Sequence, residues 1–404
     1  MNLYEDLKWR GLIKDVAGDD LKEKLNGKPI TFYWGTDPTA DSLHIGHYSS
    51  LVTVKRLINA GHHAIVLCGG ATGRIGDPRP TAEREILDYK VIENNVKGIK
   101  NQLNRLFNGK AEMVDNYEWL KDMTLLDFLR DIGKYINVNY MINKDIISRR
   151  LETGITFAEF SYTLLQGYDF LHLFETKNCI MQVEGSDQWG NITTGIELIK
   201  KKLNKEAYAF TMPLILDANG VKFGKSEGNA IWLDKNKTSP YTIYQYLINS
   251  DDSKVFEYLK VFTFLTREEI EKIMAEQKEH PETRIAQKTL AYEVVKDIHS
   301  KEDAEKAKSM SESLFTGDIS KLSDSEIEEV FKDTEKLKLT NDPIIDQLVN
   351  NKIASSRREA REFLNNNAIS LNGETINDEN YIINTNRKYN IIRRGKKKYY
   401  IFEK

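Results

Sequence analysis

Two β-prone runs near the N-terminus flank a segment with helical periodicity. Residues 30–35 read Ile-Thr-Phe-Tyr-Trp-Gly, and residues 64–68 read Ala-Ile-Val-Leu-Cys. Between them, apolar side chains recur at helical spacing from Leu51 to Ile58, and Gly61 ends the pattern. The order strand, helix, strand predicts a βαβ unit with two parallel strands. We therefore expect an α/β fold built on a parallel sheet.

The composition of the 404-residue chain supports two or three packed domains. Hydrophobic residues make up 40% of it, and the net charge of −3 gives no overall sign of a nucleic-acid partner. Cys68 and Cys179 suit neither a disulfide framework nor a metal site, so we expect both to be buried packing residues. No signal peptide and no apolar run of membrane-spanning length is visible. We expect a cytoplasmic protein with no membrane partner and no tightly bound metal.

The chain changes character after residue 239. Residues 240–335 are rich in Glu and Lys and have helical periodicity, which predicts a helical domain. Residues 343–404 carry 12 Lys and Arg against 7 Asp and Glu, a balance of +5, so the rest of the chain has a balance of −8. A basic C-terminal domain on an acidic protein indicates an anionic partner such as RNA.

Two short motifs, far apart in the sequence, indicate ATP chemistry. His44 and His47 stand at the predicted start of the first crossover helix, where phosphates bind in parallel α/β sheets. Lys222 and Lys225 lie on a glycine-containing loop. Paired lysines suit a polyphosphate whose negative charge grows during reaction. Together the motifs predict attack on the α-phosphate of ATP with release of pyrophosphate.

A polar face on an otherwise apolar helix predicts a pocket for a small polar molecule. In the predicted helix 157–175, Tyr162, Gln166 and Asp169 project from one side. A solvated stripe is the alternative, but the apolar residues around them leave little room for water. The carboxylate of Asp169 could accept a hydrogen bond from a substrate hydroxyl.

Three other segments leave two interpretations open. Asp187, in the sequence Gly-Ser-Asp-Gln-Trp-Gly-Asn, either binds a ribose diol or caps a helix predicted from Thr193. Asp77 either forms a turn only or lines a site. Residues 123–156 contain apolar side chains that either pack in the core or form a subunit interface.

Taken together, these segments resemble the bacterial-type tyrosyl-tRNA synthetases, which are class I aminoacyl-tRNA synthetases. The resemblance covers nearly the whole chain. It is carried by residues 33–47 (YWGTDPTADSLHIGH), 160–166 (FSYTLLQ), 185–191 (GSDQWGN) and 222–226 (KFGKS), and in the tail by residues 353–361 (IASSRREAR) and 369–373 (ISLNG).

The resemblance implies an architecture of three domains. Residues 1–239 would form a Rossmann-like catalytic domain with a dimer-interface insertion, to which Phe157 would contribute. Residues 240–335 would form a helical anticodon-binding domain, and residues 343–404 a small α+β, S4-like RNA-binding domain. A homodimer would bind each tRNA(Tyr) with both subunits.

The resemblance also implies roles for individual residues. The phenol of tyrosine would bond Tyr33 and Asp169, and its ammonium group would meet Asp77, Tyr162 and Gln166. The residues implied to bind ATP are Gly35, Asp37, His44, His47, Gly185, Asp187, Gln188 and Lys225. The residues implied to act in catalysis are His44, His47, Lys222, Lys225 and Ser226. The residues implied to bind RNA phosphates are Arg357, Arg358 and Arg361.

The implied reaction is the activation of tyrosine by ATP and Mg²⁺, followed by transfer of the tyrosyl group to tRNA. A tryptophanyl-tRNA synthetase, another nucleotidyltransferase and a non-catalytic RNA-binding scaffold are the alternatives. Trp34, Glu184 and a shortened loop after Asp77 depart from the family pattern. These departures affect the expected ATP contacts, where Arg79 or Arg84 could replace a lysine.

Overall fold

The structure is a computed structural model that describes residues 1–78, 87–226, 229–316, 319–332, 334–395 and 398–404. Its contacts divide the chain into two units, residues 1–238 with 250–286 and residues 239–249 with 287–404. Within the described residues, no helix is long and apolar enough to cross a membrane.

The first unit is built on a six-stranded sheet in the order β1-β6-β5-β2-β3-β4. Its strands are β1 (Val16–Ala17), β2 (Thr31–Thr36), β3 (His63–Cys68), β4 (Ala111–Asp115), β5 (Cys179–Gly185) and β6 (Tyr208–Met212). Only the edge strand β1 is antiparallel to its neighbour; the other five are parallel. The predicted parallel α/β fold is therefore confirmed.

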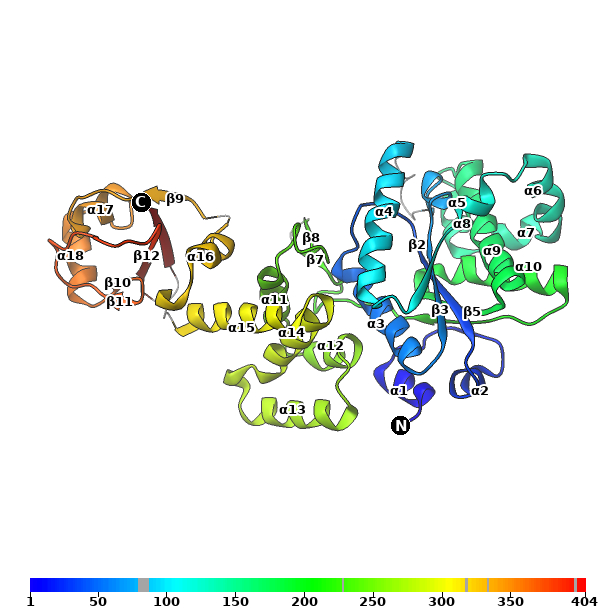
Figure 1. The fold of residues 1–404 in the computed structure, drawn as a ribbon, viewed down its shortest axis with the longest axis horizontal. Coiled ribbons are helices and arrows are strands. Elements are labelled where there is room, and N and C mark those ends of the chain that lie inside the picture. The colour runs from blue at the N-terminus through cyan, green and yellow to red at the C-terminus, as the bar shows by residue number, and fades with distance from the viewer. Residues whose placement is uncertain (79–86, 227–228, 317–318, 333, 396–397) are drawn as a thin grey trace. The chain divides into compact units, whose positions relative to one another are not determined.

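Long helices cover both faces of this sheet. Helices α3 (Ile45–Asn59) and α4 (Tyr89–Leu106) pack on one face, while α9 (Phe157–Lys177) and α10 (Trp189–Leu203) pack on the other (Figure 1). The connections therefore reverse direction between β2 and β5. Ligands of open α/β sheets bind in the crevice at such a reversal, beyond the carboxyl ends of the strands.

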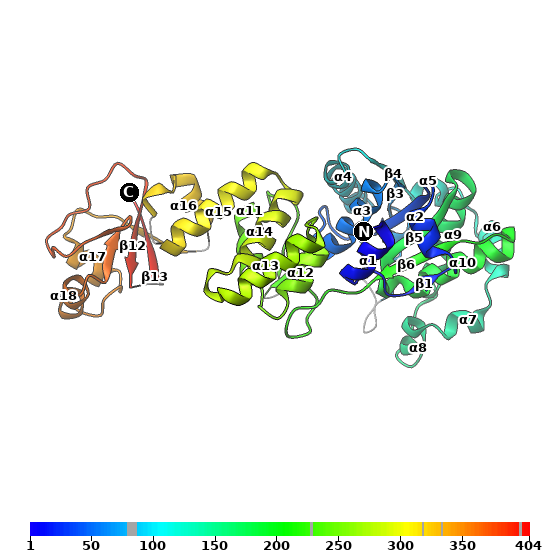
Figure 2. The same cartoon turned by 90° about the horizontal axis from the view of Figure 1, so that it is seen from below.

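Shorter helices complete the unit. They are α1 (Leu3–Arg10), α2 (Leu21–Asn26), α5 (Tyr117–Leu120), α6 (Leu125–Asp131), α7 (Val138–Ile142), α8 (Asp145–Leu151), α12 (Val255–Phe262) and α13 (Arg267–Glu279). Helices α6, α7 and α8 lie on the side of the unit away from α3 (Figure 2). A two-stranded ribbon of β7 (Lys225–Ser226) and β8 (Asn229–Ala230) follows the main sheet.

The second unit joins helices to a small sheet. Its helices are α11 (Pro240–Ile248), most of α14 (Ile285–Ile298), α15 (Lys301–Thr316), α16 (Asp324–Val330), α17 (Ile344–Asn350) and α18 (Arg357–Asn365). Its strands are β9 (Lys336–Lys338), β10 (Ile369–Leu371), β11 (Glu374–Thr375), β12 (Tyr389–Arg394) and β13 (Lys398–Glu403). The order of this sheet is β11-β10-β12-β13-β9.

Two helical boundaries were not evident from the sequence. Helices α12 and α13 fall in the first unit, so residues 240–335 are distributed over both units. Strand β9 precedes residue 343 but pairs in parallel with β13, at the end of the chain. The residues of the C-terminal sheet therefore begin before the basic segment does.

Candidate active site

The candidate site begins where the parallel strands end. Asp37 follows β2, Asn116 follows β4 and Ser186 follows β5, while Thr72 follows β3 after a short loop. Parallel strands bring their carboxyl ends to one edge of the sheet, so these segments gather there. Helix α9 adds its polar face from the other side, which includes the buried carboxylate of Asp169.

Two side chains that sequence analysis missed hold Asp169. The Nδ2 atom of Asn116 donates to Asp169 Oδ2 at 2.9 Å, and the indole nitrogen of Trp119 donates to Asp169 Oδ1 at 2.8 Å. Burial raises the pKa of Asp169 to about 7 despite these two hydrogen bonds. Their only signal in the sequence is their place just after a strand, because neither lies in a recognisable motif. The carboxylate is thus oriented before any substrate binds.

Tyr33 offers a polar atom that the protein itself does not pair. Its side chain is buried, and among the described residues its hydroxyl has no hydrogen-bond partner. The ring lies 5.3 Å from that of Phe170, between centroids, which fixes its plane. Burial, and next the charge of Asp169, raise the pKa of Tyr33, so the phenol stays protonated. A buried unpaired hydroxyl is costly, and a substrate hydroxyl would satisfy it.

A second polar network links Asp77 to the end of β5. Asp77 accepts hydrogen bonds from Gln188 Nε2 at 2.9 Å and from Asn191 Nδ2 at 3.1 Å. Asn191 Nδ2 also donates to Gln166 Oε1 at 3.0 Å. Asp77 is therefore more than a turn former. Its carboxylate and the Gln166 oxygen are both acceptors, which suits an ammonium group.

Tyr162 lies in a third group, around Asp37. Its hydroxyl donates to Asp37 Oδ2 at 2.8 Å, and the hydroxyl of Thr72 donates to Asp37 Oδ1 at 2.7 Å. Thr72 in turn accepts from Asn116 Nδ2 at 3.0 Å. Asp37 is thus connected through Thr72 and Asn116 to Asp169, so the two carboxylates share one rigid framework.

His44 and His47 close the N-terminal end of α3 by capping each other. The Nδ1 atom of His44 accepts from the Gly46 N–H at 3.1 Å, and the Nδ1 atom of His47 accepts from the His44 N–H at 3.3 Å. A neutral imidazole whose Nδ1 accepts carries its proton on Nε2. Burial, and next the neighbouring His44, lower the pKa of His47 to about 3. Each histidine can therefore offer a neutral Nε2–H donor to a phosphate.

The lysine-containing segment runs beside the histidine segment. The Ile45 N–H donates to the Ile231 carbonyl and the Leu233 N–H to the Leu43 carbonyl, each at 2.8 Å. Gly224 has a φ of +91°, and a Cβ there would meet Ile45 Cγ2 at 2.6 Å. Only glycine permits this approach. The two motifs, separated by about 180 residues, thus belong to one site.

The nucleotide side of the crevice contains the departures from the family pattern. Glu184 is buried, and its Oε1 accepts from the Gly35 N–H at 2.5 Å. Burial raises the pKa of Glu184, although the Gly35 hydrogen bond opposes this. Trp34 is also buried. Arg79 and Arg84 fall outside the described residues.

The residues around Asp187 differ from a capped helix. Asp187 is exposed in a 3-10 turn, η3 (Ser186–Gln188), that begins directly after Gly185. Helix α10 starts at Trp189, earlier than predicted, and no side chain caps it. Asp187 is therefore available for a ligand, as its alternative interpretation requires.

The insertion and the tail show two further surfaces. Of the apolar residues in the insertion, Ile136 and Met141 are buried in the core. Five apolar side chains on or near α6 to α9 are instead exposed, namely Leu125, Leu126, Leu129, Val138 and Phe157. In the tail, α18 carries Arg357, Arg358 and Arg361 on the surface, where Arg357 pairs with Asp346 and Arg361 with Glu379.

Residues 25–316 match the family described as tRNA synthetases class I (W and Y). Residues 326–402 match the C-terminal domain described as tyrosine--tRNA ligase SYY-like. The chain is 47% identical to the tyrosine--tRNA ligase of Geobacillus stearothermophilus over 99% of both chains. It is 46% identical to tyrosine--tRNA ligase 1 of Bacillus subtilis, also over 99% of both chains.

Solved structures agree in fold. A C-terminally truncated mitochondrial tyrosyl-tRNA synthetase of Aspergillus nidulans superposes with a TM-score of 0.70 and 36% identity, over 78% of this chain and 94% of that one. A tryptophanyl-tRNA synthetase of Encephalitozoon cuniculi, at 17% identity and a TM-score of 0.54 over 75% of this chain and 87% of that one, shares the fold alone. With near-complete coverage at 47% identity, the chain belongs to the tyrosine--tRNA ligase family of class I tRNA synthetases.

Proposed function

We propose that this chain activates L-tyrosine with ATP and transfers the tyrosyl group to the 3′ end of tRNA(Tyr). The observation that carries the choice of tyrosine is the pairing of a buried, pre-oriented carboxylate, Asp169, with the unpaired hydroxyl of Tyr33. A phenol hydroxyl can donate to the first and bond the second. Phenylalanine in the same pocket would leave both unsatisfied.

Adenylate formation needs no nucleophile from the protein. A carboxylate oxygen of tyrosine forms a bond to the α-phosphorus of ATP, the bond to the bridging oxygen breaks, and pyrophosphate leaves. The Nε2–H groups of His44 and His47 donate to phosphate oxygens, while Lys222 and Lys225 stabilise the charge on the leaving pyrophosphate. Mg²⁺, which prefers phosphate oxygens, accompanies ATP as part of the substrate.

In the second step, a ribose hydroxyl at the 3′ end of tRNA attacks the tyrosyl carbonyl carbon and AMP leaves. We place the ammonium group between Asp77, Tyr162 and Gln166, because the first and last supply acceptor oxygens. The ribose of ATP lies near Gly35, Gly185 and Asp187, and Gln188 borders the α-phosphate. The protein contributes position and charge rather than a covalent intermediate.

The test is ATP–pyrophosphate exchange with each of the twenty amino acids in turn. Exchange with tyrosine alone supports the assignment, and exchange with tryptophan would assign the chain to the other branch. Absence of exchange with every amino acid would leave only RNA binding. Charging of tRNA(Tyr) in the cytoplasm then follows from the second step.

The exposed apolar side chains of the insertion support a homodimer. Leu125 and Leu126 are 68% and 77% exposed, and Phe157 is 72% exposed. Apolar groups gathered on a surface favour association with a complementary surface. Leu126→Asp should therefore raise the dimer dissociation constant in analytical ultracentrifugation, whereas Lys278→Asp on α13 should not.

The basic tail supports tRNA binding, and the helices before it a role at the anticodon. Arg358 and Arg361 line one surface hollow on α18. Arg358→Gln with Arg361→Gln should weaken tRNA charging and lower its salt dependence, since fewer phosphates are neutralised. The same variant should exchange pyrophosphate at the wild-type rate. If tRNA charging does not change, α18 has no part in RNA binding.

A further inference from the structure

The lysine segment rests on one helix of the first unit. Phe223, between the two lysines, is 6% exposed. Its ring lies 4.8 Å from that of Tyr258 and 4.7 Å from that of Phe262, both on α12. The ring of Tyr48, from the histidine-bearing helix α3, stacks on Phe262 at 6.0 Å. Helix α12 is therefore an aromatic platform shared by the histidine helix and the lysine segment.

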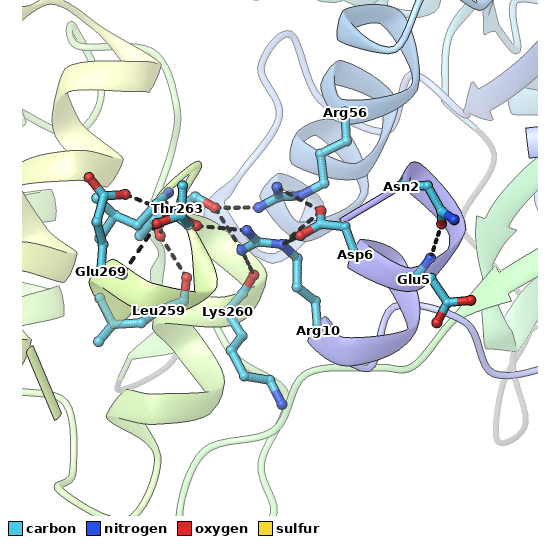
Figure 3. Close-up of polar contacts among 11 residues, drawn as sticks. Asn2, Glu5, Asp6, Arg10, Arg56, Leu259, Lys260, Thr263 and Glu269 are labelled. Carbon is cyan, nitrogen blue, oxygen red and sulfur yellow. Dashed lines mark hydrogen bonds and ion pairs between the residues drawn. The ribbon is translucent and has the colours of Figure 1, made fainter. Parts of the chain in front are cut away.

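Two buried arginines hold the C-terminal end of this platform (Figure 3). Arg10 donates from Nη1 to the carbonyls of Lys260 at 2.8 Å and Thr263 at 3.3 Å, and from Nη2 to that of Leu265 at 2.7 Å. Arg56, which projects from α3, also donates to the Thr263 carbonyl. The last carbonyls of a helix have no partner within it and carry partial negative charge. The two guanidinium groups satisfy both requirements.

One carboxylate keeps the two guanidinium groups together. Asp6 accepts from Arg10 Nε at 2.8 and 2.9 Å and from Arg56 Nη1 at 3.4 Å. Arg10 is 4% exposed and Arg56 is 7% exposed, so water screens these interactions little. Lysine could not reproduce the Arg10 contacts, because an ammonium group is a compact charge without the planar fork that reaches several carbonyls.

We propose that Arg10 and Arg56 are positioning residues for adenylate formation. By fixing the C-terminal end of α12 they fix the platform under Phe223, and with it the approach of Lys222 and Lys225 to ATP. The inference rests on the proposed role of the lysine segment. Neither arginine touches substrate, and the tyrosine pocket is built from other elements. Their loss should therefore act on the rate of the chemical step and leave tyrosine binding unchanged.

The test measures tyrosine binding at equilibrium and adenylate formation in single-turnover reactions of the full-length protein. Arg10→Gln and Arg56→Gln should each slow adenylate formation roughly 10- to 100-fold, a typical result of a small misplacement of reacting groups. The dissociation constant for tyrosine should stay within about twofold of wild type. Arg56→Lys should recover more of the rate than Arg10→Lys, because Arg10 contacts three carbonyls.

A matched control and a double variant complete the experiment. Arg267→Gln removes an exposed ion pair with Glu271 on the next helix and should change neither quantity. Phe223→Leu, which keeps an apolar side chain but loses the ring contacts, should slow the same step. Its effect should not add to that of Arg10→Gln, since both act through α12. Circular dichroism and Tm show whether each variant is folded, and Phe223→Leu tests the platform should an arginine variant fail to fold.

Three outcomes would overturn the inference. They are wild-type rates in the folded arginine variants, a defect confined to tyrosine binding, and additive effects of Arg10→Gln and Phe223→Leu. These outcomes are distinct from failure of the proposed function, because that would abolish tyrosine-dependent exchange in the wild-type protein itself.

Discussion

The tyrosine pocket and the lysine segment serve the same proposed reaction but are built differently. In the pocket, polar side chains bond one another: Asp169 is held by Asn116 and Trp119 before a ligand arrives. The lysine segment is held by backbone hydrogen bonds and by the ring of Phe223, while Lys222 is exposed to solvent. One region has fixed side chains and the other has a fixed backbone with a solvated charge.

This difference follows from when each region has to act. Selectivity for a hydroxyl requires donors and acceptors that cannot rearrange to accept a competitor, so the pocket is rigid and buried. The lysines respond to charge that appears only as pyrophosphate leaves, and an exposed, long side chain can follow that charge. Variants of the two regions should therefore fail in different steps.

The largest effect is expected in the pocket. Asp169→Ala removes the acceptor for the phenol and leaves Asn116 and Trp119 without their partner, so tyrosine activation should fall by several powers of ten. Tyrosyl-tRNA synthetases are themselves the standard example of this hydroxyl selectivity, so the direction is a property of the family. Pyrophosphate exchange measures it. Wild-type exchange by the variant would remove Asp169 from the site.

The next effect belongs to the lysine segment. Lys225→Ala should slow adenylate formation by about 10² to 10³, the usual result of losing one group that stabilises transition-state charge. Tyrosine binding should be nearly unchanged, because the lost interaction is made only in the transition state. Stopped-flow kinetics with equilibrium dialysis separates the two quantities. If only tyrosine binding weakens, the two regions are not functionally distinct.

A smaller effect sharpens the role of the unpaired hydroxyl. Tyr33→Phe should reduce the preference for tyrosine over phenylalanine by roughly 1–2 kcal/mol, the value of one neutral hydrogen bond. The ratio of kcat/KM for the two amino acids in pyrophosphate exchange gives this quantity. Tyr48→Phe, on α3 and outside the proposed pocket, is the matched control. Equal ratios in Tyr33→Phe and wild type would show that the Tyr33 hydroxyl does not contact the substrate.

The smallest effect concerns stability, because a buried carboxylate in the pocket has a cost. The pKa of Asp169 is about 7 in the folded protein, above the ordinary value near 3.9 of an unfolded chain. The folded state therefore holds this proton more tightly, and the stability it contributes is lost as the pH rises through 7. Asp169→Asn should gain Tm relative to wild type on going from pH 5.5 to pH 8.5, by roughly 2 °C or more.

Calorimetry at the two pH values measures this difference. Lys222→Gln, in the exposed lysine segment, should show no comparable change with pH. A Tm difference between Asp169→Asn and wild type that is the same at both pH values would show that Asp169 titrates no differently in the folded protein.

Local patterns in the sequence determined the parts of this protein that depend on neighbours along the chain. The periodicity from residue 30 to residue 68 is sufficient for a βαβ unit, since burial on one helix face and between sheet layers repeats locally. The face of α9 with Tyr162, Gln166 and Asp169 follows from helix geometry alone. The roles of these residues came from resemblance to a family, and they stay predictions until the variants above are measured.

Only the tertiary structure decided which distant groups meet. Asn116 and Trp119 support Asp169 because strand order brings the end of β4 to α9, and no spacing in the chain encodes that meeting. The proton on Nε2 of each histidine is set by backbone hydrogen bonds that form at the start of α3. The aromatic platform joins side chains from α3, the lysine segment and α12, which are more than 200 residues apart at the extremes. Periodicity reports burial, whereas the identity of a buried partner depends on the path of the whole chain.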